Sequence, residues 1–123
     1  MRSAQSTLAV DVKPEGPMVT IHLVGELDIT SSPLLQAVVE QSLASRREPG
    51  CEQLVVDMSG VSFADASGLS PLLLARATLA RRGGRIALRH CRRPVLRLLR
   101  ALDLEDLADG PGQAALGAAP PVG

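Results

Sequence analysis

Hydrophobic and polar residues alternate in two short stretches near the start of the chain. Such alternation with a period of two is typical of strands with one buried face. The apolar positions that share a face are Leu8, Val10 and Val12 in LAVDV, and Val19, Ile21 and Leu23 in VTIHLV. Between them KPEGP predicts a turn, because proline fixes φ and glycine accepts positive φ. We therefore predict an opening β-hairpin.

A helical period replaces this alternation in three later segments, each with a start or stop signal. Residues 30–46 begin with hydroxyl residues and Pro33, residues 67–82 end at Arg-Gly-Gly, and residues 92–102 carry Pro94 near their start. The positions expected to face inward are Leu34, Leu35, Val38, Val39 and Leu43 in the first, Leu69, Leu72, Leu73, Ala77 and Ala80 in the second, and Val95, Leu98, Leu99 and Leu102 in the third. These segments predict three helices, the third with Arg93, Arg97 and Arg100 outward.

Two further apolar runs lie between the helices. Leu54 to Val56 lacks polar alternation, which favours a strand covered on both faces and ending at Asp57, and RIALR at residues 85–89 predicts another strand. The order β-β-α-β-α-β-α predicts an α/β single domain, with a mixed sheet of four to five strands, parallel crossovers and three to four helices. We expect this domain to span residues 1–109. Residues 110–123 predict a Gly/Pro/Ala-rich tail, with at most a helical turn at 113–116.

Composition limits the function. A chain of 123 residues suits one domain, and its 13 basic and 13 acidic residues give no field that attracts nucleic acid or a membrane surface. Phe63 is the only aromatic residue, which argues against single-strand nucleic-acid readers. Cys51 and Cys91 form no metal or disulfide pattern. No apolar stretch is long enough to cross a membrane or form a signal core, so we expect a soluble cytoplasmic protein without cofactor or metal.

Two loops carry the candidate functional residues. GELDITSS at residues 25–32 leaves the second predicted strand, and DMSGVSFADASG at residues 57–68 leaves the third. Functional groups gather where the strands of an α/β sheet end, because those loops present side chains and free amides together. A hydroxyl at a helix start lies beside unpaired N–H groups and the positive end of the helix dipole. This place favours a capping serine or a phosphoserine at Ser67.

Three segments of the chain resemble the signature regions of the STAS family, which comprises anti-sigma factor antagonists and sulfate transporter domains. They are GELDI, LVVDMSGVSFADASGL and RRGGRIALRHCRRPVLRLLRALDLEDL, and the resemblance covers about residues 8 to 107. It implies a non-enzymatic partner-switching regulator of transcription that binds an anti-sigma factor, which in such systems is often a serine kinase. The residues that the resemblance places on the partner-binding surface are Asp28, Thr30, Asp65, Ala66, Ser67, Gly68 and Leu69.

The chain departs from this family at the phosphorylated position. The usual acceptor directly follows the aspartate of the D-S-[ST]-G-L motif, and here that position is Ala66, which has no oxygen to phosphorylate. Ser67 matches the second hydroxyl residue and would be a substitute acceptor only if the partner kinase tolerates a shift of one residue, which turns the side chain by roughly 100° on a helix. We therefore expect an antagonist that resists phosphorylation, or one whose partner is not a kinase.

Structural roles remain open for the same residues. Ser67 and Gly68 can cap the helix, and Ser70-Pro71 is an even better start signal; a helix beginning before Ser67 should be distorted at Pro71. Asp65 can bond nearby loop amides, and Asp28 with Thr30 can cap the first helix. Gly25 and Gly60 are expected where positive φ or close approach is needed.

Two other functions compete with the antagonist. The chain can be the small STAS subunit of a lipid or anion transport assembly, bracing an ATPase. An enzyme would use Ser67 as nucleophile with His22 or His90 as base, but no G-x-S-x-G motif supports it. We expect both histidines at the surface. The arginine stripe predicts a solvated face, with docking of an acidic partner as the alternative.

Overall fold

The computed structural model describes residues 8–44 and 50–109. Two strands come first, β1 (Ala9–Glu15) and β2 (Met18–Leu27), followed by α1 (Ser32–Leu43), β3 (Gln53–Ala64) and α2 (Ala66–Arg81). The chain continues through β4 (Arg85–Arg89) and α3 (Arg93–Ala101). A 3₁₀ turn, η1 (Glu105–Leu107), and the two-residue strand β5 (Ala108–Asp109) complete the described part. The predicted element order is confirmed.

The strands form one sheet in the order β1-β2-β3-β4-β5. β1 and β2 are an antiparallel hairpin, whereas the pairs β2–β3, β3–β4 and β4–β5 are parallel. Parallel neighbours need a crossover, and α1 and α2 provide the crossovers from β2 to β3 and from β3 to β4. The mixed sheet predicted from the sequence is therefore confirmed, with β5 as its fifth strand.

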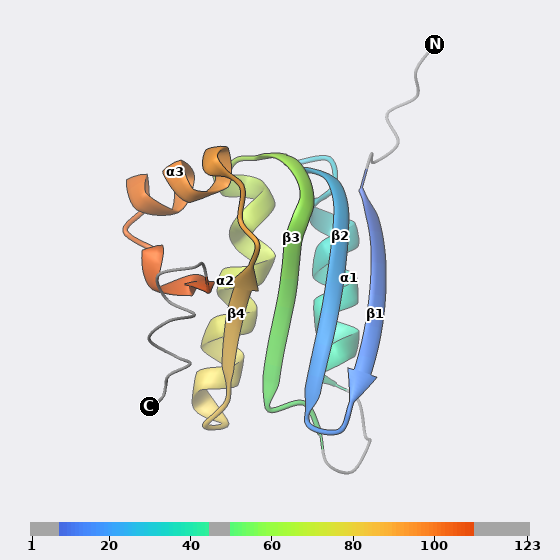
Figure 1. Ribbon diagram of the computed structural model, residues 1–123. Coiled ribbons are helices and arrows are strands. Elements are labelled where there is room, and N and C mark those ends of the chain that lie inside the picture. The colour runs from blue at the N-terminus through green and yellow to red at the C-terminus, as the bar shows by residue number, and fades with distance from the viewer. Residues whose placement is uncertain (1–7, 45–49, 110–123) are drawn as a thin grey trace.

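The core lies between the sheet and the two long helices, α1 and α2, which pack on one face of it (Figure 1). Every second residue of the strands points into this layer, as in Val19, Ile21 and Leu23 of β2, none of which is more than 1% exposed. The opposite face of the sheet carries polar residues. Val55 lies between the core-facing Leu54 and Val56, and all three are buried, as the unbroken apolar run predicted.

Several boundaries and faces differ from the prediction. β1 continues through Lys13, Pro14 and Glu15, so the turn contains only Gly16 and Pro17. The third strand does not end at Asp57, because β2 provides pairing partners for it as far as Ala64. Because β3 extends to Ala64, the candidate site residues that follow it lie beside the end of β2.

Some side chains expected inside are exposed. Leu34 and Leu102 are 40% and 38% exposed, since each lies near an end of its helix. In α2 the buried stripe runs through Leu69, Leu72, Ala75 and Leu79, so Ala77 and Ala80 fall on the solvent side, contrary to the prediction. Arg93, Arg97 and Arg100 are exposed on α3, as predicted.

Glycines act as the sequence suggested at three positions. Gly25 has φ of 128° and Gly83, after α2, has φ of 76°. Gly60 lies so close to β2 that an added Cβ would be 2.7 Å from the Leu23 carbonyl oxygen. The predicted tail at 110–123 lies outside the described residues, so the domain boundary at residue 109 stays a prediction. Within the described ranges, no helix is both long and apolar enough to cross a membrane.

Candidate functional site

The two loops chosen from the sequence meet at one edge of the sheet. β2 and β3 are parallel, and their last residues pair as Leu27 with Ala64. The backbone N–H of Asp65 then donates to the Leu27 carbonyl at 3.0 Å, which joins the start of one loop to the other. We call the surface formed by residues 25–32 and 62–69 the loop face; it lies at the top of Figure 1.

Gly68 fixes how closely the two loops approach. A Cβ on Gly68 would lie 2.1 Å from the Leu27 carbonyl carbon and 2.5 Å from the Asp28 nitrogen. Neither atom belongs to a flexible side chain, so no larger residue fits without moving the backbone. The first turn of α2 therefore packs directly on the backbone that leads into α1. No local sequence pattern predicted this contact.

Asp65 is the N-cap of α2. Its Oδ1 accepts the Gly68 backbone N–H at 2.9 Å and the Ser67 hydroxyl at 2.7 Å. These bonds, the one from Ser67 first, hold the pKa of Asp65 below its ordinary value because they stabilise the carboxylate. The predicted bonding of Asp65 to a nearby amide is confirmed, and its carboxylate accepts hydrogen bonds from the first turn of its own helix.

α2 begins at Ala66, so Ser67 lies inside the helix and Ser70 is not its cap. Pro71 therefore falls within the helix, where its missing N–H leaves the Ser67 carbonyl without the usual partner. The Ser70 hydroxyl donates to that carbonyl at 3.0 Å. The helix is assigned without a break from Ala66 to Arg81. Ser70 replaces the hydrogen bond that Pro71 removes.

Exposure separates the predicted contact residues. Ala66 is exposed at the start of α2, and Asp65 and Ser67 are half-buried. Gly68 and Leu69 are buried beneath them. The exposed part of the α2 start is therefore an alanine methyl group beside an occupied serine hydroxyl, while Gly68 and Leu69 support this surface from within.

The companion loop is closed by a reciprocal pair of hydrogen bonds. Asp28 Oδ1 accepts the backbone N–H groups of Thr30 and Ser31, each at 3.0 Å. Ser31 Oγ accepts the Asp28 N–H at 3.0 Å and donates to the Glu26 carbonyl at 2.7 Å. Ser31 is 1% exposed, whereas Thr30 is exposed. Asp28 thus closes the turn into α1, and Thr30 remains on the surface.

Exposed apolar side chains surround these loops, and sequence reasoning missed them. Residues 8–44 and 50–109 contain seven exposed large hydrophobic residues, and four of them belong to the loop face or its border: Val24, Ile29, Leu34 and Phe63. Ile29 is 74% exposed and Phe63 is 46% exposed. Exposed apolar residues at one edge of a domain are typical of protein contact surfaces. One signal was available, since Phe63 is the only aromatic residue and stands two positions before Asp65.

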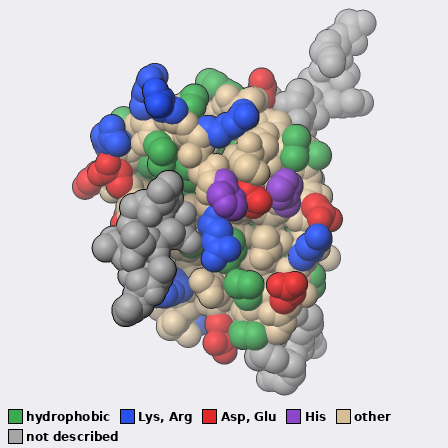
Figure 2. All heavy atoms as spheres, in the orientation of Figure 1, with side chains coloured by type: hydrophobic (Ala, Val, Ile, Leu, Met, Phe, Trp, Pro, Cys, Tyr) green, Lys and Arg blue, Asp and Glu red, His purple; other side chains and the backbone are tan. Residues whose placement is uncertain are grey.

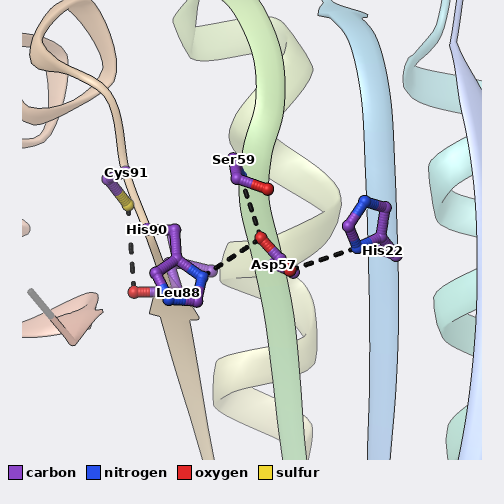
Figure 3. Close-up of polar contacts among 6 residues, drawn as sticks. All are labelled: His22, Asp57, Ser59, Leu88, His90 and Cys91. Carbon is purple, nitrogen blue, oxygen red and sulfur yellow. Dashed lines mark hydrogen bonds and ion pairs between the residues drawn. The ribbon is translucent and has the colours of Figure 1, made fainter.

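The two histidines meet at Asp57, on the polar face of the sheet (Figure 3). His22 Nδ1 lies 3.1 Å from Asp57 Oδ2, and His90 Nδ1 lies 3.4 Å from Asp57 Oδ1. Figure 2 shows the two histidine side chains at the surface with an acidic group between them, and their surface exposure was predicted. The carboxylate that they share was not predicted, because it depends on the register that pairs Asp57 with His22 and with Arg89, the residue before His90.

Neither histidine is placed to act as a base for Ser67. Both histidines contact Asp57, whereas the Ser67 hydroxyl donates to Asp65. Partial burial tends to raise the pKa of Asp57, but hydrogen bonds from Ser59 and His90 and the nearby His22 lower it below its ordinary value.

Burial raises the pKa of the Cys91 thiol to about 11, so this thiol stays protonated at neutral pH. Residues 8–44 and 50–109 contain no cluster of three or more metal-ligating side chains.

Comparison with known proteins identifies the family of this chain. The family model described as "Mlab, STAS domain" matches residues 10–109. The anti-sigma F factor antagonist of Paenibacillus polymyxa is 27% identical over 92 residues, which are 75% of this chain and 76% of that protein. The anti-sigma-B factor antagonist of Bacillus subtilis is 27% identical over 100 residues, covering 81% and 87%.

A solved structure shares the fold. The anti-sigma factor antagonist SpoIIAA, in its unphosphorylated form, superposes with a TM-score of 0.71 at 21% sequence identity. The match covers 83% of this chain and 87% of SpoIIAA.

Proposed function

Because the chain belongs to the STAS domain family, we propose that it is an anti-sigma factor antagonist, a regulator that binds an anti-sigma factor through its loop face. Both curated relatives carry this function in their names. The protein acts by surface complementarity and not by catalysis. Its partner is an anti-sigma factor, and release of the sigma factor follows when the partner is occupied.

The observation that carries this proposal is the exposure of Ala66 among apolar side chains. Ala66 begins α2 at the surface, and Ile29 and Phe63 are exposed on the same loop face. The carboxylates of Asp28 and Asp65 are bonded to backbone amides of their own loops. A surface with a fixed backbone and exposed apolar groups suits docking, since little conformational entropy is lost on binding. Ser67 has no histidine within hydrogen-bonding reach, which gives a hydrolytic role no support.

We further propose that the usual phosphorylation switch does not operate at Ala66. A phosphate would add about −1.5 to −2 charge at the start of α2 and oppose close packing of a partner. Alanine cannot accept it. Ser67 is a poor substitute, because the residue is half-buried and its hydroxyl donates to Asp65 at 2.7 Å.

Binding of purified anti-sigma factors from the same genome, measured by calorimetry, tests the main proposal. Ala66→Asp and Ser67→Asp should each weaken binding by about tenfold or more, because they place charge in the docked surface. Ala80→Asp is the matched control, an exposed alanine of the same helix far from the loop face. Equal affinity of all four proteins would remove the loop face from the interface.

Mass spectrometry after incubation with ATP and the bound anti-sigma factor tests the absence of the switch. The wild-type mass should not change. If the partner is a kinase, Ala66→Ser should gain one phosphoryl group, which would show that only the acceptor is missing. A phosphoryl group mapped to Ser67 of the wild type would overturn the proposed resistance.

The transport alternative is less well supported. The curated relatives are named as anti-sigma factor antagonists, and neither name refers to transport. Capture of an ATP-binding cassette subunit in place of an anti-sigma factor would favour the alternative.

A further inference from the structure

Charge is unevenly distributed along this chain, although its net charge is zero. Residues 66–102 contain nine arginines and no acidic residue. The remaining residues therefore hold all 13 acidic side chains. A separation of this kind produces local fields that a net charge of zero conceals.

Two of these arginines are neutralised by carboxylates close to α3. Arg76 pairs with Asp106, and Arg100 Nε lies 2.9 Å from Glu105 Oε2. Within residues 8–44 and 50–109, Arg92, Arg93 and Arg97 have no ion pair with a carboxylate. All three are exposed. Arg93 and Arg97 are four residues apart on α3, so they share one face of the helix.

The packing of α3 determines what this face can bind. Val95 and Leu99 are buried, so the apolar side of α3 is already used by the core and only its charged side faces solvent. A helix that inserts into a membrane interface needs a free apolar face, which α3 lacks. The single aromatic residue of the chain, Phe63, provides little stacking surface for nucleic acid. The chemistry of the face favours carboxylates, which guanidinium groups bind in bidentate fashion.

The position of α3 connects this face with the loop face. α3 starts at the end of the sheet where β3 leads into α2 (Figure 1). In the same orientation, basic side chains gather over α3 (Figure 2). A protein docked on the start of α2 can therefore extend a segment along α3.

We infer that Arg92, Arg93 and Arg97 bind an Asp/Glu-rich segment of the protein that docks on the loop face. This inference rests on the proposed function and names the chemistry of the partner beyond the α2 start. Exposed charges of this kind mainly accelerate association and select among partners, and their effect declines with added salt.

The test compares two double variants with the same change of charge. Arg93→Glu/Arg97→Glu reverses the α3 face, and Arg81→Glu/Arg85→Glu reverses two exposed arginines between the end of α2 and the start of β4. Association rates with the bound anti-sigma factor are measured by stopped flow at low and high salt. Thermal unfolding verifies that each variant is folded, and Arg93→Gln/Arg97→Gln replaces the first variant if it is not.

We expect the α3 variant to associate about tenfold more slowly at about 50 mM salt, with most of the difference lost at about 500 mM. The control variant should change by less than about twofold. Equal slowing of both variants would show only a net-charge effect and overturn the inference, as would unchanged rates in the α3 variant.

Failure of this inference is distinguishable from failure of the proposed function. If Ala66→Asp weakens binding and the α3 variant does not, the loop face stands and the role of α3 is wrong. If no anti-sigma factor binds the wild type, the proposed function is wrong. Arginine-dependent binding of phosphatidylglycerol vesicles or duplex DNA would assign α3 to another ligand and overturn the acidic-segment inference.

Discussion

The two helix starts of the loop face use the same residue types with opposite results. Before α1, Asp28 and Ser31 bond reciprocally, and Ser31 is 1% exposed. At α2, Asp65 holds Ser67, but Ser67 is half-buried and Ala66 before it is exposed. An aspartate followed by a serine therefore does not by itself indicate a surface hydroxyl.

The difference arises from the depth at which each helix begins. Ser31 Oγ reaches back to the carbonyl of Glu26 in β2, so the α1 start is tied into the sheet. The α2 start is held instead by the contact of Gly68 with the backbone of Leu27 and Asp28. The serine of the α1 start is thus buried, while the α2 start has a buried support below an exposed first residue. A partner can reach Ala66 but not Ser31.

Gly68→Ala should have the largest effect, because it forces the two starts apart. The added Cβ would overlap backbone atoms, and we expect a loss of about 3 kcal/mol in the free energy of unfolding. Chemical denaturation measures this loss. Gly83→Ala is the control: it has a positive φ of 76° but open space around it, and should cost about 1 kcal/mol. Equal losses would show that close approach at Gly68 is unimportant.

Ser31→Ala and Ser67→Ala compare the two serines directly. Loss of the Ser31 hydroxyl leaves the Asp28 N–H and the Glu26 carbonyl without this partner, which should cost about 2 kcal/mol. Loss of the Ser67 hydroxyl leaves Asp65 still bonded to the Gly68 N–H and should cost about 0.5 kcal/mol. Urea unfolding of both variants measures the difference. A larger loss for Ser67→Ala would reverse the assignment of structural and exposed starts.

Asp65→Ala tests the cap of α2. Removal of the N-cap carboxylate should cost about 1 kcal/mol at neutral pH, while Asp65→Asn should lose less because asparagine also caps helices. Both are compared by thermal unfolding. If Asp65→Ala is as stable as the wild type, Asp65 does not hold the α2 start.

Acid should produce the smallest effect and affect the Asp65 cap specifically. The pKa of Asp65 is lower in the folded protein than in the unfolded chain, so its contribution is complete above the unfolded pKa and is lost as pH falls through the folded pKa. The advantage of the wild type over Asp65→Asn should therefore begin to decline below about pH 3.9 and be lost once the pH is below the folded pKa. Unfolding midpoints from pH 7 to acid measure it. An advantage that persists in strong acid would contradict the role of the carboxylate.

Much of the fold follows from local patterns in the sequence. Alternation predicted β1 and β2, proline and hydroxyl residues predicted the start of α1, and Arg-Gly-Gly predicted the end of α2. The same local logic failed at Ser70-Pro71, which resembles a helix start but lies inside α2. Asp65 provides the cap there because β3 extends to Ala64, an extension that depends on pairing with β2.

The candidate site shows the same division. The sequence alone placed Asp28, Asp65 and Ser67 on loops that follow strands, and it alone shows that residue 66 has no acceptor oxygen. Only the tertiary structure determined that Gly68 joins the loops, that Ile29 and Phe63 are exposed, and that His22 and His90 share Asp57. The physical reason is the distance along the chain over which each kind of interaction acts. Periodicity and capping act within a few residues of the chain, whereas these contacts depend on the register between strands that are far apart in sequence.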